Sequence, residues 1–167
     1  PMRIRSRPRR TWKIFLMQNS QAKSTTSPHI RPLPTLRDDV ERLICTAQYG
    51  ENANGDGGQY NCWGLLRYIE RAHFGIDLPT TSLGDAMARL YDARMKSGDW
   101  QVVDEPFHGA GVLMRAGAGP HCGVWLDFDG GGVLHCERGT GVRFIRSSEL
   151  RMHGYSKLKF YRFENNG

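Results

Sequence analysis

Three side chains that could act together in acyl transfer are spread along the chain: Cys62, His121 and His135. Cys62 stands where a polar, glycine-rich segment gives way to an apolar helical pattern. The unpaired amides and the positive dipole end of a helix N-terminus favour a thiolate over a thiol. A thiolate attacks an amide carbonyl, one imidazole carries the proton, and a further polar group orients that imidazole. The three residues therefore predict a nucleophile, a base and an orienting group, without a cofactor.

The two histidines are expected to meet across a hairpin. Residues 127–130 have the composition of a three-residue turn with Gly130 in the left-handed position, which centres the hairpin near Phe128. Residues at equal distances from the centre pair with each other, and His121 and His135 are equally far from Phe128. The spacing therefore predicts that both imidazoles lie on the same side of the sheet.

A zinc site is the main structural alternative, because Cys122 directly follows His121 and Cys136 directly follows His135. Side chains alternate between the two faces of a strand, which places both cysteines opposite the histidines. Four ligands divided between two faces cannot surround one ion, so we expect no metal. Small buried thiols are the simpler interpretation of Cys122 and Cys136.

Three residues near Cys62 are candidates for the oxyanion hole or for substrate binding: Tyr49, Asn61 and Trp63. Asn61 has the type and position of a helix N-cap. The backbone N–H of Cys62 and the hydroxyl of Tyr49 are expected to stabilise the oxyanion. Trp63 directly follows the nucleophile.

The apolar pattern changes in kind along the chain. Helical spacing covers residues 36–48, 62–75 and 82–96, and short runs bounded by glycine or proline cover 111–115, 121–126, 132–136, 141–145 and 158–163. Helices followed by a series of strands predict an α+β domain. We expect N-terminal helices packed on a mostly antiparallel sheet of five or six strands.

The charge is unevenly distributed along the 167 residues. Residues 1–35 contain eight lysines and arginines and no acid, whereas the remainder has 15 basic and 17 acidic residues. We interpret residues 1–35 as a basic flexible arm and residues 36–167 as one domain. The arm could touch nucleic acid or an anionic surface, but a solvated tail is the simpler interpretation, and we expect no nucleic-acid partner. No apolar run is long enough for a membrane span or a signal-peptide core.

The candidate residues resemble the NlpC-type cell-wall cysteine peptidases, which have a compact papain-like fold. The similarity runs from about residue 36 to residue 163, and its three blocks are 61–66, 121–126 and 133–136. Tyr49 is similar to the family's tyrosine before the cysteine. The Cys-Trp-Gly-Leu form of the first block and the segment 73–79 look most like the branch carried by tailed phages and prophages.

The resemblance implies a Cys62–His121–His135 triad that hydrolyses amide bonds in peptidoglycan stem peptides, often between D-glutamate and a diamino acid. It implies a tail-associated cell-wall hydrolase with phage tail proteins as partners. Such a protein would reside in the virion tail, or in the host cytoplasm before assembly, and would act at the bacterial cell wall. The absence of a recognisable signal peptide fits that location. The chain departs from the family in having Asn61 where an aspartate is common, and Gly109-Ala110-Gly111 where Gly-Asp often stands.

Two other interpretations stay open. One is a structural tail-assembly module of the same fold with weak or no activity. The other is an amidase or acyltransferase of related fold that uses the same three residues. The latter requires an apolar groove beside Cys62, and the sequence offers no obvious additional hydrophobic stretch to build one.

Overall fold

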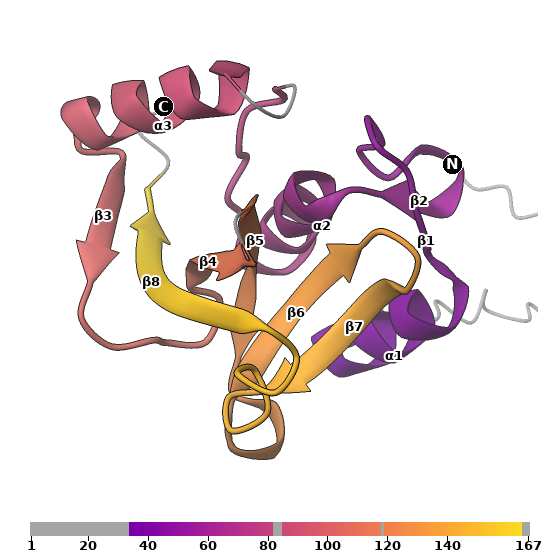
Figure 1. Cartoon of the computed structure of the whole chain (residues 1–167). Helices are drawn as coiled ribbons and strands as arrows, with labels where there is room; N and C mark the ends of the chain where they lie inside the picture. The colour runs from indigo at the N-terminus through magenta and orange to yellow at the C-terminus, as the bar shows by residue number, and fades with distance from the viewer. Residues whose placement is uncertain (1–33, 82–84, 118, 165–167) are drawn as a thin grey trace, which may run out of the picture. The chain divides into compact units, whose positions relative to one another are not determined.

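Three α-helices and a six-stranded antiparallel sheet form the described part of the chain, residues 34–81, 85–117 and 119–164, in the computed structural model (Figure 1). The predicted α+β class is therefore confirmed, and the sheet has the larger of the two expected strand numbers. The arm predicted for residues 1–35 lies outside the described residues apart from its last two. No helix within the described ranges is both long and apolar enough to cross a membrane.

The first helix, α1 (Leu36–Thr46), begins with a reciprocal cap. The Asp38 amide donates to Thr35 Oγ1 at 3.2 Å, and the Thr35 amide donates to Asp38 Oδ2 at 3.1 Å. The helix ends two residues before the predicted boundary. Residues 48 and 49 instead form a short strand, β1 (Gln48–Tyr49), which pairs in parallel with β2 (Gln59–Tyr60).

The second helix, α2 (Cys62–Ile69), continues into a π-helical turn (Glu70–Phe74) that ends at Gly75 in the left-handed conformation. The wider turn shifts the buried side of the helix. Glu70 is completely buried next to Ile69, whereas Ala72 is exposed. A third helix, α3 (Asp85–Ser97), ends before Gly98, as the sequence predicts.

The six strands are β3 (Trp100–Val103), β4 (Gly111–Ala116), β5 (Gly119–Leu126), β6 (Gly132–Glu137), β7 (Gly141–Arg146) and β8 (Tyr155–Phe163). Their order in the sheet is β3-β8-β4-β5-β6-β7, and every neighbouring pair is antiparallel. The last strand thus lies between β3 and β4, far from its neighbours in sequence (Figure 1). The sequence pattern of residues 100–103 does not predict β3.

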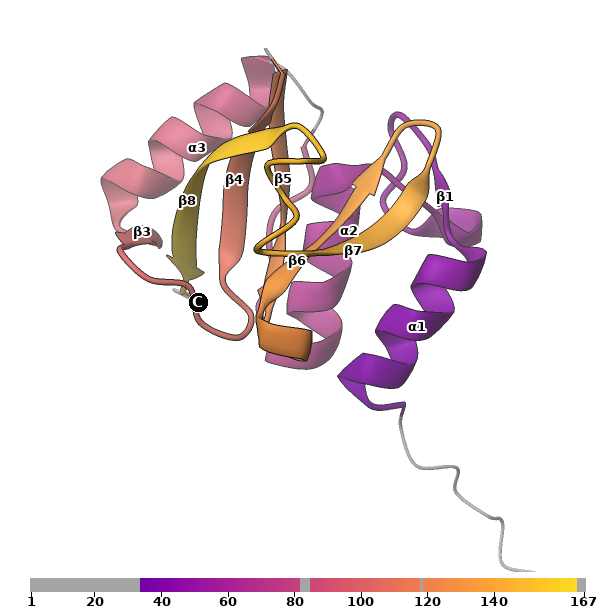
Figure 2. The same cartoon turned by 60° about the horizontal axis from the view of Figure 1, so that its bottom comes forward.

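One hydrophobic core lies on each face of the sheet. One core joins α1 and α2 to the sheet through residues such as Leu43, Leu65 and Leu134. In Figure 2, α1 lies beside β7, α2 beside β5 and β6, and α3 near β3. The second core contains Val133 and Tyr155 on the opposite face. The helix that carries Cys62 is therefore held against the strands that carry the histidines.

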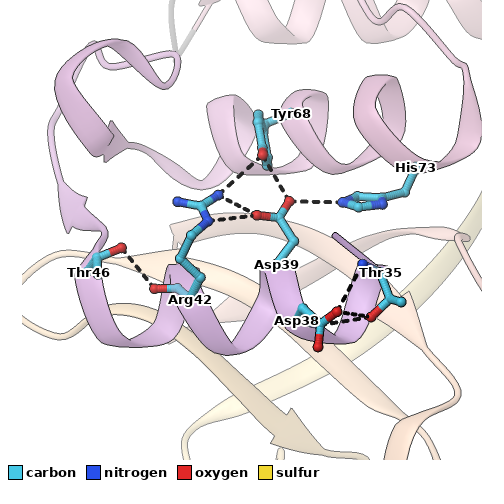
Figure 3. Close-up of polar contacts among 7 residues, drawn as sticks. All are labelled: Thr35, Asp38, Asp39, Arg42, Thr46, Tyr68 and His73. Carbon is cyan, nitrogen blue, oxygen red and sulfur yellow. Dashed lines mark hydrogen bonds and ion pairs between the residues drawn. The ribbon is translucent and has the colours of Figure 1, made fainter. Parts of the chain in front are cut away.

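A buried carboxylate ties α1 to α2 and to the π-helical turn (Figure 3). Asp39 is 2% exposed and accepts hydrogen bonds from the Tyr68 hydroxyl at 2.9 Å and the Arg42 Nε at 3.0 Å. The oxygen that accepts from Tyr68, Oδ2, also lies 2.9 Å from His73 Nε2. Burial alone would raise the pKa of Asp39, but the hydrogen bonds from His73, Arg42 and Tyr68 outweigh it and lower that pKa. This network fixes α2 relative to the rest of the domain.

Candidate active site

Asn61 caps the helix that begins with Cys62, as the sequence predicts. Its Oδ1 accepts from the Gly64 amide at 2.6 Å, and its Nδ2 donates to the Glu51 carbonyl at 3.0 Å. The side chain is 3% exposed and both of its polar ends bind backbone. These contacts give Asn61 the role of positioning the first turn of α2. A direct contact with substrate stays a prediction.

The glycine-rich loop before Cys62 lies directly on this first turn. The Asn61 amide donates to the Ala53 carbonyl at 3.1 Å. A Cβ atom on Gly64 would lie only 2.3 Å from that same carbonyl oxygen, so a larger residue would displace the loop. Gly64 thus permits the close contact that fixes the surroundings of the thiol.

Cys62 is partly buried, and its pKa is lowered to about 4. The largest cause is a hydrogen bond from the Cys122 thiol, which together with the His121 side chain and the Cys122 backbone amide outweighs the opposing effect of burial. The same contact raises the pKa of Cys122 well above its usual value. The Cys122 thiol therefore stays protonated and donates a hydrogen bond to the Cys62 thiolate.

The donor role of Cys122 predicts a change in the pH profile of Cys62 alkylation. Wild-type Cys62 should react with iodoacetamide at pH values well below the ordinary thiol pKa of 9.0. Cys122→Ala removes the largest stabilising hydrogen bond, so the midpoint should move to higher pH and the rate at pH 6 should fall. Mass spectrometry of the peptide that contains Cys62 measures this rate.

Cys122→Ser is the matched variant, because a hydroxyl retains the donor. Its alkylation midpoint should stay closer to that of the wild type than the midpoint of Cys122→Ala. Identical midpoints for wild type and Cys122→Ala would show that Cys122 does not stabilise the thiolate.

His121 and His135 are in direct contact, with His121 Nε2 at 3.0 Å from His135 Nδ1. His135 is completely buried, and burial, followed by the positive charges around it, lowers its pKa to about 3. A neutral His135 that accepts at Nδ1 carries its proton on Nε2. His121 then donates from Nε2, which leaves its Nδ1 for the thiol of Cys62.

The contact between the histidines arises from a different register than predicted. Val124 pairs with Leu134 and Leu126 with Gly132, so Gly123 rather than His121 is in register with His135. The prediction was wrong because residues 127–131 form a longer connection that contains a 3₁₀ turn (Phe128–Gly130). The shift is two residues, which preserves the face of each side chain. The predicted shared face therefore survives, and the histidines meet diagonally.

The β5–β6 ladder stops before it reaches the histidines. It pairs residues 124–126 with 132–134, so the edge of β5 at His121 and Cys122 is not bound to β6. The helix α2 packs beside β5, and Cys62 at its start lines the same cavity as His121 and Cys122. This placement explains how Cys62 interacts with consecutive residues whose side chains lie on opposite faces of the strand.

Tyr155 holds both imidazoles in place and was missed by the sequence analysis. Its ring stacks on His121 with centroids 5.5 Å apart and meets the edge of His135 at 4.9 Å. The predicted last strand began at residue 158, whereas β8 begins at Tyr155. The sequence feature that could have indicated this strand start is a tyrosine directly after Gly154, ahead of the predicted strand 158–163.

The cysteines that follow the histidines lie on the other face of the sheet, as the alternation argument predicts. Cys136 is completely buried in the helix-facing core, and its sulfur donates to the Tyr60 carbonyl at 3.2 Å. Cys122 packs against the same core. Over the described ranges, no group of three or more His, Cys, Asp and Glu residues is arranged to bind a metal ion.

The two remaining candidates, Trp63 and Tyr49, differ in burial and in their contacts. Trp63 is buried beside Trp100, with ring centroids 5.7 Å apart, and its Nε1 donates to the Pro79 carbonyl at 3.1 Å. Tyr49 is partly buried in β1, and the Arg138 guanidinium lies 5.6 Å from its ring centroid. A role of the Tyr49 hydroxyl at the oxyanion stays a prediction.

A cavity of about 350 Å³ opens beside Cys62. Cys62, His121 and Cys122 form one part of its wall, and the rest consists mainly of apolar and aromatic side chains, among them Trp63, Leu66, Met87, Tyr91, Trp100, Leu113, Tyr161 and Phe163. No continuous hydrophobic stretch of the sequence predicts such a groove. The reason is that residues from six separate elements, α2, α3, β3, β4, β5 and β8, build it together.

Comparisons with known proteins give no further indication, since no protein-family model matches the chain and no curated protein matches its sequence.

Proposed function

We propose that Cys62, His121 and His135 form the catalytic triad of a cysteine hydrolase that cleaves amide bonds. The observation that carries this proposal is the chain of contacts from a thiol with a lowered pKa, through His121, to a neutral buried His135. This is the order that a nucleophile, a base and an orienting group require.

The reaction follows from these roles. Cys62 reacts as the thiolate, with its proton held on His121 Nδ1, and Sγ forms a bond to the substrate carbonyl carbon. The carbon–nitrogen bond breaks, and His121 donates the proton to the departing amine. Water then attacks the thioester, with His121 Nδ1 taking its proton, and the carbon–sulfur bond breaks to release a carboxylic acid and restore the Cys62 thiolate. His135 accepts from His121 Nε2 throughout and holds the ring in the productive tautomer.

The backbone N–H of Cys62 is the first oxyanion donor in this proposal, because the first amides of a helix have no partner within the helix. The Tyr49 hydroxyl is the second, a role that requires it to turn from Arg138 toward the substrate. Asn61 supports the first of these donors, because its cap fixes the start of α2.

The proposed substrate is the stem peptide of peptidoglycan. The resemblance of residues 61–66, 121–126 and 133–136 to the NlpC-type cell-wall peptidases supports this assignment and a papain-like fold. The form of the cysteine block supports a phage or prophage tail-associated hydrolase that acts at the cell wall, with tail proteins as partners.

Mass spectrometry of purified stem peptides tests the proposal. Incubation with the wild type at neutral pH should give a cleavage product that Cys62→Ala does not form. Cys45→Ala is the matched control, since Cys45 is exposed and lies on α1, and it should form the product at the wild-type rate. Identical product with Cys62→Ala would refute the triad. The lack of any product with all three proteins would favour the structural tail-assembly module.

A further inference from the structure

The cavity beside Cys62 has an unusually apolar wall for a site that cleaves polar peptides. Trp100 forms its centre, packed against Trp63, Tyr91 and Phe163 with ring centroids 5.3 to 6.3 Å apart. Its size lies within the range of about 300 to 1,000 Å³ that is typical of small-molecule sites. The wall therefore offers a large aromatic surface next to the reacting sulfur.

Three polar groups of the aromatic wall are bound to other protein groups. Tyr91 and Tyr161 share a hydrogen bond between their hydroxyls at 3.0 Å. The indole N–H of Trp63 is bound to the Pro79 carbonyl. Each of these groups already has a hydrogen-bond partner in the protein, and a polar ligand would lose hydrogen bonds to water against the apolar remainder of the wall.

The cavity is open to solvent. Ala88, Asp92 and Pro120 line it and are exposed, whereas Trp63 and Trp100 at its depth are buried. Apolar surface that is open to water costs free energy unless a ligand covers it. Because the reactive residues Cys62 and His121 share the wall, the ligand that covers it is expected to be part of the substrate.

We propose that the substrate of Cys62 carries an aliphatic or aromatic group next to the scissile bond, and that this group occupies the cavity. This inference rests on the proposed thiol chemistry and refines its substrate class. A stem peptide with only polar side chains at the cleaved bond would leave the cavity unfilled. Among stem peptides and other amides or esters, the preferred substrate is therefore one with a larger apolar substituent next to the cleaved bond.

The chemical step is the same for such a substrate. The Cys62 sulfur forms a bond to the carbonyl carbon, the bond to the leaving nitrogen or oxygen breaks, and His121 returns the proton to that atom. Water hydrolyses the thioester. The apolar group can belong to the acyl part, which stays bound to Cys62, or to the leaving group, which departs first.

Two ester series distinguish these positions. The first contains p-nitrophenyl esters of acids with two to eight carbons, and the second contains acetate esters of alcohols with one to eight carbons. In one series, kcat/KM should rise with chain length by up to about fourfold per methylene, the factor that corresponds to ~0.8 kcal/mol. A flat profile in both series, with hydrolysis that still requires Cys62, would refute only the cavity inference. No Cys62-dependent hydrolysis of any ester or stem peptide would instead refute the proposed function.

A pair of variants on one helix locates the effect. Ala88→Phe places a ring into the cavity and should lower kcat/KM for the longest ester at least tenfold more than for the shortest. Ala93 is also exposed on α3 but does not line the cavity, so Ala93→Phe should keep the wild-type length dependence. Equal profiles for the two variants would contradict the proposal.

Discussion

Replacement of His121 by alanine is expected to lower kcat by about 10³-fold or more. His121 is the group that carries the proton in both halves of the proposed reaction, and it also helps to stabilise the Cys62 thiolate. The loss should therefore appear in turnover and as a shift of Cys62 alkylation to higher pH. Steady-state kinetics with a p-nitrophenyl ester measures the first effect, and alkylation followed by mass spectrometry measures the second.

A matched pair of variants at His135 separates its orienting role from its packing role. Asparagine places an acceptor near the position of His135 Nδ1, whereas leucine has a similar size and no acceptor. His135→Asn should retain most of the activity, and His135→Leu should lower kcat at least about tenfold. Equal activity of the two variants would show that the contact at 3.0 Å does not orient His121.

Full activity of His121→Ala, in contrast, would refute the catalytic mechanism itself.

The chemistry-bearing positions could be predicted because they depend on local rules. A glycine-rich segment before an apolar helical pattern is enough to place Cys62 in the first turn of α2, and the residue type of Asn61 is enough to predict its cap. Strand alternation fixes the face of His121 and Cys122 regardless of the exact register. The first-turn position of Cys62, the Asn61 cap and the strand faces are therefore as predicted, whereas the catalytic roles stay predictions.

The remaining features depend on contacts between distant segments. The register between β5 and β6 depends on the 3₁₀ turn at residues 128–130, which the turn composition did not distinguish from a three-residue loop. Tyr155 reaches the histidines because β8 inserts between β3 and β4. The cavity combines side chains from six elements that are separated along the chain. No local pattern encodes such combinations.

Glu70 shows how a local irregularity changes the energetics of the fold. The π-helical turn buries this carboxyl completely, and within the described ranges neither of its oxygens has a hydrogen-bond partner. Burial raises the pKa of Glu70 to about 8 from an ordinary value of 4.5. The folded protein thus keeps the proton of Glu70 at pH values where the unfolded chain has released it.

Glu70→Gln should therefore remove a strong pH dependence of stability. Between pH 4.5 and 8 the folded state binds more protons than the unfolded state, so the wild-type free energy of unfolding falls as pH rises. The loss at pH 8 is at most about 5 kcal/mol for the change in pKa of Glu70. The glutamine is neutral at every pH, so Glu70→Gln should melt near the wild-type temperature at pH 5 and roughly 10 °C above it at pH 8.

Thermal unfolding of the full chain at a series of pH values measures this difference. Glu41→Gln is the matched control, since Glu41 is exposed on α1, and its melting curve should follow the wild type across the series. Parallel pH dependence of wild type and Glu70→Gln would mean that the carboxyl is solvated or paired in solution. A difference that grows as pH rises from 4.5 to 8 would instead show that the folded protein keeps Glu70 protonated and is destabilised as this proton is lost.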